Sequence, residues 1–301
     1  MARSTWDELP PAVRAAIERE AGPVAAAEIP AAGRNSDFSA TLHTADGRVF
    51  CKGIADAEGK RGQMHRHEAD INPWLPSAVA PRLRWRTEAD GWLLLGFDHV
   101  TGHHADLSPG SPDLPVVAAA VNTLASHRPS CTSEAPSLAG QWTRLAAWRR
   151  LSKIPTFLDE WSLTHLDQLI TWEARAAEIA DGRSLVHTDL HSLNILIDSE
   201  QARIVDWAWS RRGAPAIDIA FMVARLVAAG HTSAGAERWA DALPAWQATT
   251  ADERTAFAVA ISGIWTYLSN QQPRDLWSEL VPAARTWAHH RVSKASKCDL
   301  E

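Results

Sequence analysis

The chain has 301 residues, of which 46% are apolar and 22% are charged, a balance typical of a globular protein and not of a disordered one. A formal net charge of −6 indicates no general affinity for nucleic acid, and no apolar run predicts a signal peptide or a membrane-spanning helix. Cys51, Cys131 and Cys298 are too widely spaced to predict a disulfide framework or a metal site, so we expect a reducing, cytoplasmic location.

The N-terminal third of the chain is predicted to be rich in β-strands. Apolar residues at Leu9, Val13 and Ile17 predict an amphipathic helix over residues 6–21. An Asp-Gly pair lies between two strand-like runs at Gly47 and again at Gly91, which predicts two β-hairpins. A helix is expected within residues 59–76. The expected strands cover residues 24–29, 40–43, 49–54, 82–87 and 91–97.

The composition changes at residues 101–115, where Gly, Pro, Ser, Asp and His predict a boundary or linker. Beyond it the apolar periodicity is mostly helical. The expected helices cover residues 115–126, 138–151, 155–180, 217–229, 234–243, 252–270 and 276–293, and short strands are expected at 185–187, 195–197 and 203–205. We therefore expect a β-rich N-terminal lobe at residues 1–98, a hinge at 99–115 and a larger helical lobe at 116–301.

The short strands are accompanied by polar residues in the order His187-x-Asp189-x4-Asn194, followed by two strands and Asp206. Asp189 is suited to accept or orient the proton of a hydroxyl group, whereas Asn194 and Asp206 offer the oxygen ligands that Mg²⁺ prefers. His187 precedes the aspartate, where it can brace the loop by hydrogen bonding. Each residue alone could be a cap or a turn residue, but the combination is the one that in-line phosphoryl transfer requires.

The sequence His-Thr-Asp-Leu-His-Ser-Leu-Asn at residues 187–194, followed by Val-Asp-Trp at 205–207, resembles the catalytic and metal-binding loops of the aminoglycoside phosphotransferase family. That family carries His-Gly-Asp-Leu-His-x-x-Asn and Ile-Asp-Trp/Phe, so Thr188 stands where glycine is usual. His191 and Trp207 favour this family over the protein kinases. The resemblance implies an α+β, two-lobed protein-kinase-like fold, with a small antiparallel β lobe and a larger, mainly helical lobe.

The resemblance also implies where the phosphates of ATP or GTP would bind. Lys52, on a predicted strand, corresponds to the lysine that contacts the α- and β-phosphates, and Glu68 on the following helix corresponds to its partner. The loop at residues 33–39 contains Ser36 and is placed to cover the phosphates. It has a single glycine, and an ordinary hairpin loop is the alternative interpretation.

Other residues are expected to support the site. Main-chain groups from Asp98 to Val100 correspond to the family's hinge and would contact the nucleotide base. Asp218, at the start of a predicted helix, corresponds to a carboxylate that accepts main-chain N–H groups of the catalytic loop. His191, the second histidine of the motif, is assigned a supporting role.

The resemblance implies Mg²⁺-dependent transfer of a γ-phosphoryl group from a nucleoside triphosphate to a hydroxyl of a small molecule, with no nucleic acid or membrane partner. An antibiotic or related natural product is the preferred acceptor, in resistance or biosynthesis. One alternative is a housekeeping metabolite such as an amino alcohol, a sugar or a homoserine-like compound. A non-catalytic binding protein is disfavoured because Lys52, Asp189, Asn194 and Asp206 are all present.

Overall fold

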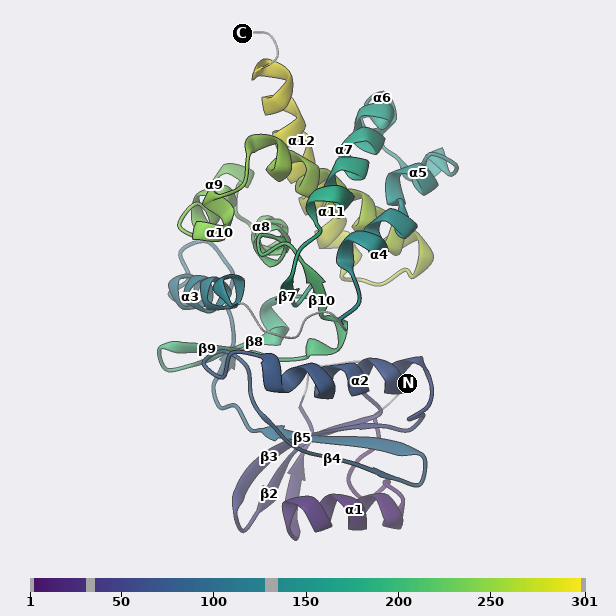
Figure 1. Ribbon diagram of the computed structural model, residues 1–301, viewed down its shortest axis with the longest axis vertical. Coiled ribbons are helices and arrows are strands. Elements are labelled where there is room, and N and C mark those ends of the chain that lie inside the picture. Colours follow the sequence, from purple (N-terminus) through teal and green to yellow (C-terminus); the bar gives the residue numbers. More distant parts are fainter. Residues whose placement is uncertain (1–2, 31–35, 128–134, 299–301) are drawn as a thin grey trace. The chain divides into compact units, whose positions relative to one another are not determined.

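The computed structural model describes residues 3–30, 36–127 and 135–298 (Figure 1). The chain divides into two compact units: the first comprises Met1–Ala105 with Ser192–Trp209, and the second comprises Asp106–His191 with Ser210–Glu301. The first unit is built on an antiparallel sheet and the second is mainly helical, so the predicted α+β class is confirmed. The lobe boundaries expected at residues 98 and 115 stay a prediction.

The first unit is organised by a five-stranded sheet with the order β1-β2-β3-β5-β4, in which neighbouring strands are antiparallel. Its strands are β1 (Val24–Glu28), β2 (Phe38–Thr44), β3 (Gly47–Ile54), β4 (Leu83–Ala89) and β5 (Trp92–Asp98). Both predicted hairpins are confirmed. The β4–β5 turn has left-handed backbone at Asp90 (φ 50°) and Gly91 (φ 78°), which an Asp-Gly pair adopts at low cost.

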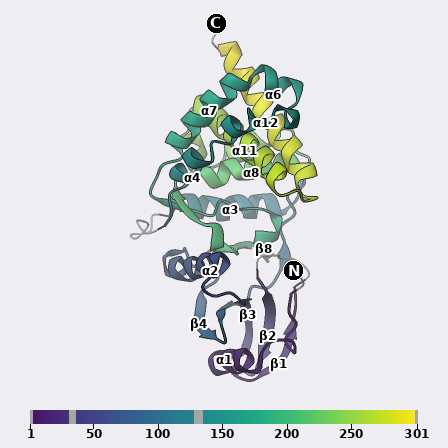
Figure 2. The same cartoon turned by 90° about the vertical axis from the view of Figure 1, so that its right-hand side faces the viewer.

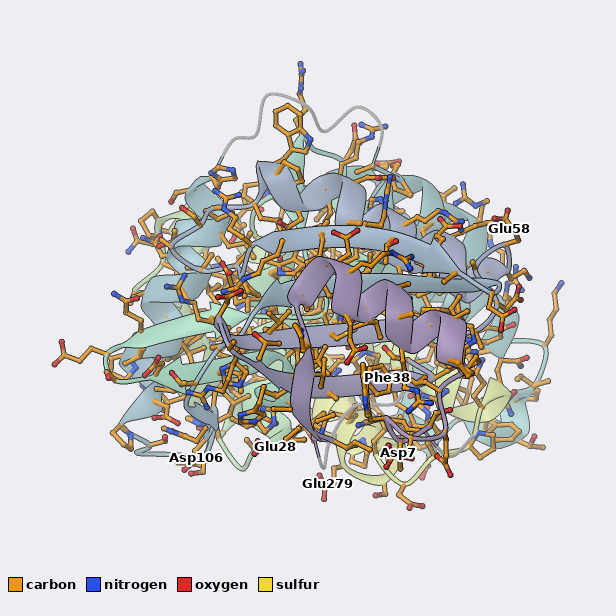
Figure 3. The ribbon with its side chains drawn as sticks, turned by 90° about the horizontal axis from the view of Figure 1, so that it is seen from below. Asp7, Glu28, Phe38, Glu58, Asp106 and Glu279 are labelled. Carbon is orange, nitrogen blue, oxygen red and sulfur yellow. The ribbon has the colours of Figure 1, made fainter. Side chains whose placement is uncertain are left out.

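Helices cover both faces of this sheet. Figure 3 shows α1 (Pro11–Ala21) lying across the strands, while α2 (Lys60–Ile71) lies on the opposite face (Figure 1). The side chains of successive β5 residues point alternately to the two faces of the sheet, as along any strand. Leu94 is buried in the apolar cluster under α1, whereas Leu95 is buried with Ala69 in the cluster under α2. The sheet therefore holds β3, which carries Lys52, rigidly between two cores.

A second, three-stranded sheet of order β6-β8-β9 also belongs to the first unit. Its strands are β6 (His103–His104), β8 (Ile195–Asp198) and β9 (Gln201–Ile204). The main-chain N–H of Ile204 donates to the carbonyl of Val79 at 2.6 Å, which ties the β8–β9 hairpin to the rest of the unit. Asn194, at the end of η3 (Ser192–Asn194), and Asp206, just before η4 (Trp207–Trp209), flank this hairpin.

The second unit consists of packed helices and one short sheet. Figure 2 shows α8 and α11 side by side, and both also pack against α12. The antiparallel sheet pairs β7 (Ser184–Val186) with β10 (Arg211–Gly213), and β10 was not predicted. The helices are α3 (Asp113–Ser126), α4 (Leu138–Leu145), α5 (Ala147–Leu151), α6 (Glu160–Thr164), α7 (Leu166–Ile179), α8 (Ile217–Ala228), α9 (Ser233–Ala240), α10 (Pro244–Gln247), α11 (Ala251–Gln271) and α12 (Trp277–Cys298), with a 3-10 turn η2 (Pro155–Phe157).

Tertiary contacts break one helix that the periodicity predicts as continuous. The expected helix over residues 138–151 is divided at Ala146, whose backbone is left-handed (φ 41°). The buried carboxylate of Glu173, on α7, accepts the N–H of Trp148 at 2.9 Å. This contact satisfies one of the N–H groups that the new helix start at α5 leaves without an intrahelical partner.

Local capping explains two further differences. The expected helix over residues 155–180 is divided into η2, α6 and α7, and Asp159 caps α6 by accepting the N–H of Ser162 at 2.8 Å. Helix α1 begins at Pro11 and not at residue 6, since proline suits the first turn of a helix. Along the part of the chain that the structure describes, no helix is both long and apolar enough to cross a membrane.

Candidate active site

Lys52, Glu68 and Asp206 form an ion-pair cluster inside the first unit. The Nζ atom of Lys52 lies 2.9 and 3.1 Å from the two carboxylate oxygens of Glu68 and 3.0 Å from Oδ1 of Asp206. Lys52 is 7% exposed and Glu68 is 2% exposed. The predicted salt bridge between strand lysine and helix glutamate is therefore present, and Asp206 joins it.

Glu68 makes a second contact that the sequence did not predict. Its Oε1 accepts the main-chain N–H of Trp207 at 3.0 Å, so the same carboxylate holds Lys52 and the segment that bears Asp206. Asp206 itself has a left-handed backbone (φ 65°), a conformation that aspartate tolerates better than most residues. Helix α2 thus fixes both the position of the lysine and the turn that presents the aspartate.

The cluster carries an excess of negative charge. Burial would lower the pKa of Lys52, but the carboxylates of Asp206 and Glu68 raise it above its ordinary value, so the ammonium group stays charged. Burial lowers the pKa of His65, which adds no positive charge at neutral pH. Two carboxylates therefore face one ammonium group, an arrangement that favours an additional cation beside Asp206.

These residues line a pocket of about 250 Å³, and every residue of its lining belongs to the first unit. The polar part of the lining includes Ser36, Ser39, Lys52, Glu68, Asn194 and Asp206, and the apolar part includes Phe50, Phe97, Leu193, Leu196 and Val205. Asn194 is 6% exposed, and its main-chain carbonyl accepts the N–H of Val205 at 2.9 Å. A pocket with apolar walls and a few convergent polar groups suits a ligand that has an aromatic part and a charged part.

The predicted hinge residues Asp98 and Val100 line the same pocket. The N–H of Asp98 donates to the carbonyl of Arg82 at 2.8 Å, and its carboxylate accepts from Nε of Arg84 at 2.7 Å. Val100 lies beyond the end of β5, and no described residue forms a hydrogen bond with its main chain. Of the predicted phosphate loop, Ser36 lines the pocket, whereas residues 33–35 lie outside the described residues.

The loop after β7, in the second unit, carries His187, Thr188 and Asp189. The buried carboxylate of Asp218, in the first turn of α8, accepts the N–H of His187 at 2.7 Å and that of Thr188 at 2.8 Å, one on each oxygen. His187 is fully buried, and its Nδ1 accepts the N–H of Asp189 at 3.3 Å. The structure thus contains the bracing contacts expected of His187 and Asp218.

The backbone at Thr188 adopts a conformation that suits glycine, the residue that the resemblance predicts at this position. Its φ of 66° lies in the left-handed region, which is costly for a β-branched residue and free for glycine. Burial raises the pKa of Asp218, and the N–H groups of His187 and Thr188 act in the opposite direction. The loop is therefore held in a strained conformation by a carboxylate that has itself been removed from water.

The side chain of Asp189 lies near basic side chains of its own unit. Nη2 of Arg225, on α8, lies 3.3 Å from Oδ1, and Nε2 of His191 lies 3.8 Å from Oδ2. Sequence reasoning missed Arg225. A signal was available, since Arg225 follows Asp218 by two helical turns and therefore lies on the same face of α8.

The predicted residues therefore gather in two places. The first unit brings together around one pocket Ser36, Lys52, Glu68, Asp98, Val100, Asn194 and Asp206. The second unit brings together His187, Asp189, His191 and Asp218. The pocket also has lining residues that the sequence did not single out, among them Arg3, Phe50 and Phe97. No sequence signal pointed to these three: Arg3 belongs to no motif, and lone aromatic residues on strands, such as Phe50 and Phe97, are ordinary core residues.

Solved structures with a similar fold include two aminoglycoside phosphotransferases. One is a thermostable mutant of APH(4)-Ia in a ternary complex with AMP-PNP and hygromycin B, with 15% identity, a TM-score of 0.65 and coverage of 94% of this chain and 98% of that chain. The other, from Alicyclobacillus acidocaldarius, has 15% identity, a TM-score of 0.63 and coverage of 96% of this chain and 95% of that chain.

A third similar structure is the choline kinase LicA from Streptococcus pneumoniae, with 14% identity, a TM-score of 0.57 and coverage of 91% of this chain and 96% of that chain. At these identities the likeness concerns the fold, and the predicted kinase-like fold is confirmed.

No curated protein matches the sequence significantly. The model of the phosphotransferase enzyme family, APH, matches residues 42–254, which is most of the chain. The chain therefore belongs to the phosphotransferase enzyme family.

Proposed function

We propose that the protein is a Mg²⁺-dependent small-molecule kinase that moves the γ-phosphoryl group of ATP or GTP to a hydroxyl of an antibiotic or related natural product. The observation that carries this proposal is the arrangement of Lys52 with Glu68 and Asp206 on the wall of one pocket that also contains Asn194. Phosphoryl transfer needs a fixed cation for the phosphates and oxygen ligands for a metal ion in such a pocket.

The lining of the pocket supports a nucleotide as the donor. The ammonium group of Lys52 would contact the phosphates, with the hydroxyl of Ser36 as a further donor. Phe50, Phe97 and Leu196 offer apolar surface for a purine ring. The main chain between Asp98 and Val100 would give the hydrogen bonds that hold the edge of the base, and both ATP and GTP stay candidates.

The donor set of the pocket fits a magnesium ion. Asn194 and Asp206 offer an amide and a carboxylate oxygen, which are hard ligands, and the excess negative charge of the cluster is compensated by a divalent cation. When bound, the ion would neutralise the charge that develops on the β- and γ-phosphate oxygens. Lys52, held by Glu68, would keep the phosphates in place against this ion-binding edge.

Asp189 is assigned the role of the residue that receives the acceptor hydroxyl. The acceptor oxygen forms a bond to the γ-phosphorus while the bond from that phosphorus to the bridging oxygen breaks, which releases the nucleoside diphosphate. The hydroxyl proton passes to the carboxylate of Asp189. In a loose transition state this transfer is late, so orientation of the hydroxyl matters more than the basicity of the carboxylate.

A second acceptor class has support from one comparison. The choline kinase from Streptococcus pneumoniae shares the fold, and choline is an amino alcohol. The APH(4)-Ia complex contains hygromycin B, an antibiotic. A kinase of a housekeeping metabolite is therefore the alternative within the same chemistry.

The deciding experiment is an acceptor panel with the purified full chain. Aminoglycosides and other hydroxyl-bearing antibiotics form one arm, and choline, sugars and homoserine-like compounds form the other, each with ATP or GTP and Mg²⁺. We expect acceptor-dependent release of nucleoside diphosphate, with phosphorylated product detected by mass spectrometry. The non-catalytic alternative would be favoured if the protein bound nucleotide but phosphorylated no acceptor, and if the Asp206→Ala variant released as much nucleoside diphosphate as the parent.

A further inference from the structure

Arg225 is an unusual side chain for the middle of a packed helix. Its side chain is 17% exposed, and Nη2 lies 3.3 Å from Oδ1 of Asp189. The guanidinium carbon stacks 4.9 Å from the ring centroid of Trp265. Its Nε is buried without a hydrogen-bond partner among the described residues. Asp189 is thus the carboxylate that faces this cation, because the contacts of Arg225 include no other acid.

The position of Arg225 on α8 connects it to the whole catalytic loop. Asp218, in the first turn of this helix, accepts the N–H groups of His187 and Thr188. Arg225 lies two turns later on the same face and contacts the carboxylate of Asp189. One helix therefore fixes both the main chain of the loop and the direction of its acidic side chain. Helix α8 is itself immobilised, since its residues from Ile217 to Ala224 are all buried.

We propose that Arg225 is a positioning residue that aims the carboxylate of Asp189 at the acceptor hydroxyl, and that Asp189 is in turn the counter-ion that allows Arg225 to be partly buried. The first half rests on the proposed function, whereas the second half concerns folding alone. The two halves are linked because a single ion pair serves both.

The physical basis is the cost of a buried charge without a partner. Burial lowers the pKa of Arg225, and the charge of Asp189 acts in the opposite direction. Removing one member of a buried ion pair is destabilising, while replacing both by uncharged groups is often tolerated. The Arg225 and Asp189 side chains are 17% and 35% exposed, so water screens part of this cost. Asp189 therefore differs from an ordinary exposed acid: neutralising it removes the counter-ion of a partly buried guanidinium as well as the group that would receive the proton.

The geometry also limits which residues can replace Arg225. A guanidinium is planar, stacks on an aromatic ring and donates from its edge, whereas an ammonium group is a point charge that cannot do both at once. Arg225→Lys keeps the charge but loses the stacked fork over Trp265. Compared with Arg225→Met, we expect Arg225→Lys to retain more of the stability of the parent, but to lose most of the orientation of Asp189.

The chain provides a closely matched control in the same unit. Arg254, on α11, has a side chain that is 18% exposed, stacks 5.0 Å from the ring centroid of Trp246 and lies 3.0 Å from Oδ1 of Asp241. Its contacts do not include the catalytic loop. Arg254→Met thus removes a similar stacked, paired arginine without touching Asp189.

The test compares the parent with Arg225→Met, Arg225→Lys, Arg254→Met, Asp189→Asn and the double variant Asp189→Asn/Arg225→Met. With the best acceptor of the panel, Arg225→Met should lower kcat by about 10–100-fold, the effect expected of a displaced catalytic group. The nucleotide KM should stay within about threefold, because Asp189 and Trp265, the partners of Arg225, do not line the nucleotide pocket. Arg254→Met should keep the kcat of the parent.

Urea unfolding tests the counter-ion role of Asp189 without an activity measurement. Asp189→Asn should lower the unfolding midpoint, and the double variant should regain most of that loss. Strictly additive midpoints would overturn the counter-ion role, and a kcat of Arg225→Met within about threefold of the parent, or an equal loss in Arg254→Met, would overturn the positioning role. If the parent phosphorylates no acceptor, the proposed function fails, but the coupling between Asp189 and Arg225 in the unfolding data still stands or falls on its own.

Discussion

The two hydrogen bonds to Asp218 give a quantitative test of how the loop of Asp189 is held. Asp218→Ala removes the acceptor of the N–H groups of His187 and Thr188, which lie 2.7 and 2.8 Å from its oxygens. Each main-chain donor left buried without a partner costs about 1–3 kcal/mol. His187 is fully buried and Thr188 is half-buried, so we expect a total loss of about 2–5 kcal/mol in the free energy of unfolding.

Asparagine should be a poor replacement at this position. Each carboxylate oxygen of Asp218 accepts a different N–H group, whereas Asn offers one acceptor oxygen and one NH₂ group. Asp218→Asn therefore accepts from one N–H group but places its NH₂ group against the other, and should also lower the free energy of unfolding. The kcat should fall in both variants, because the loop that orients Asp189 is no longer fixed.

The pH dependence of this loss has a definite sign. Burial raises the pKa of Asp218 above its ordinary value of 3.8. A carboxyl group whose pKa is raised in the folded state stabilises the fold below its unfolded pKa, and this contribution is lost as the pH rises through the folded pKa. The difference in unfolding free energy between the parent and Asp218→Ala should therefore decrease from acidic to neutral pH.

The assay is urea unfolding followed by far-ultraviolet circular dichroism, with kcat measured on the same preparations. At an m value of about 2–3 kcal/mol per M, the expected midpoint shift for Asp218→Ala is roughly 1–2 M. Asp252→Ala is the control, because the side chain of Asp252, on α11, is half-exposed and pairs with the exposed Arg175 at 2.8 Å. Equal midpoints in the two variants, with kcat preserved in both, would refute the bracing role of Asp218.

Four other substitutions test the site. Lys52→Ala should fold and bind nucleotide but lower kcat by about 10²-fold, since the phosphates lose a fixed cation; unchanged turnover would remove Lys52 from the site. Asp206→Ala, or excess chelator with the parent, should abolish turnover, and full activity with chelator would contradict the metal assignment. Asp189→Asn should lower kcat by about 10²–10⁴-fold with little change in nucleotide Kd, as measured by titration. Thr188→Gly should raise the urea midpoint modestly, because relief of about 1–2 kcal/mol of left-handed strain exceeds the entropic cost of glycine; a lower midpoint would show that the strain is compensated.

Local sequence signals determined most of the secondary structure of the first unit. Alternating apolar residues and the two Asp-Gly turns located the hairpins β2–β3 and β4–β5, because strand periodicity and turn chemistry act over a few residues. The order of His187, Asp189, Asn194 and Asp206 pointed to phosphoryl transfer for a similar reason: the chemistry requires those residue types at a short spacing. The salt bridge from Lys52 to Glu68 also followed from a motif.

Only the tertiary structure decided which segments share a unit and which charges meet. Periodicity could not break the helix at Ala146, because the cause is a carboxylate at Glu173, far along the chain. No local pattern predicted the hydrogen bond from the main-chain N–H of Trp207 to Glu68, since that contact joins residues far apart in the sequence. The pairing of Asp189 with Arg225 depends on how α8 packs beside the loop that follows β7. Such contacts are set by the packing of whole elements, whereas a sequence pattern reports only what neighbouring residues prefer.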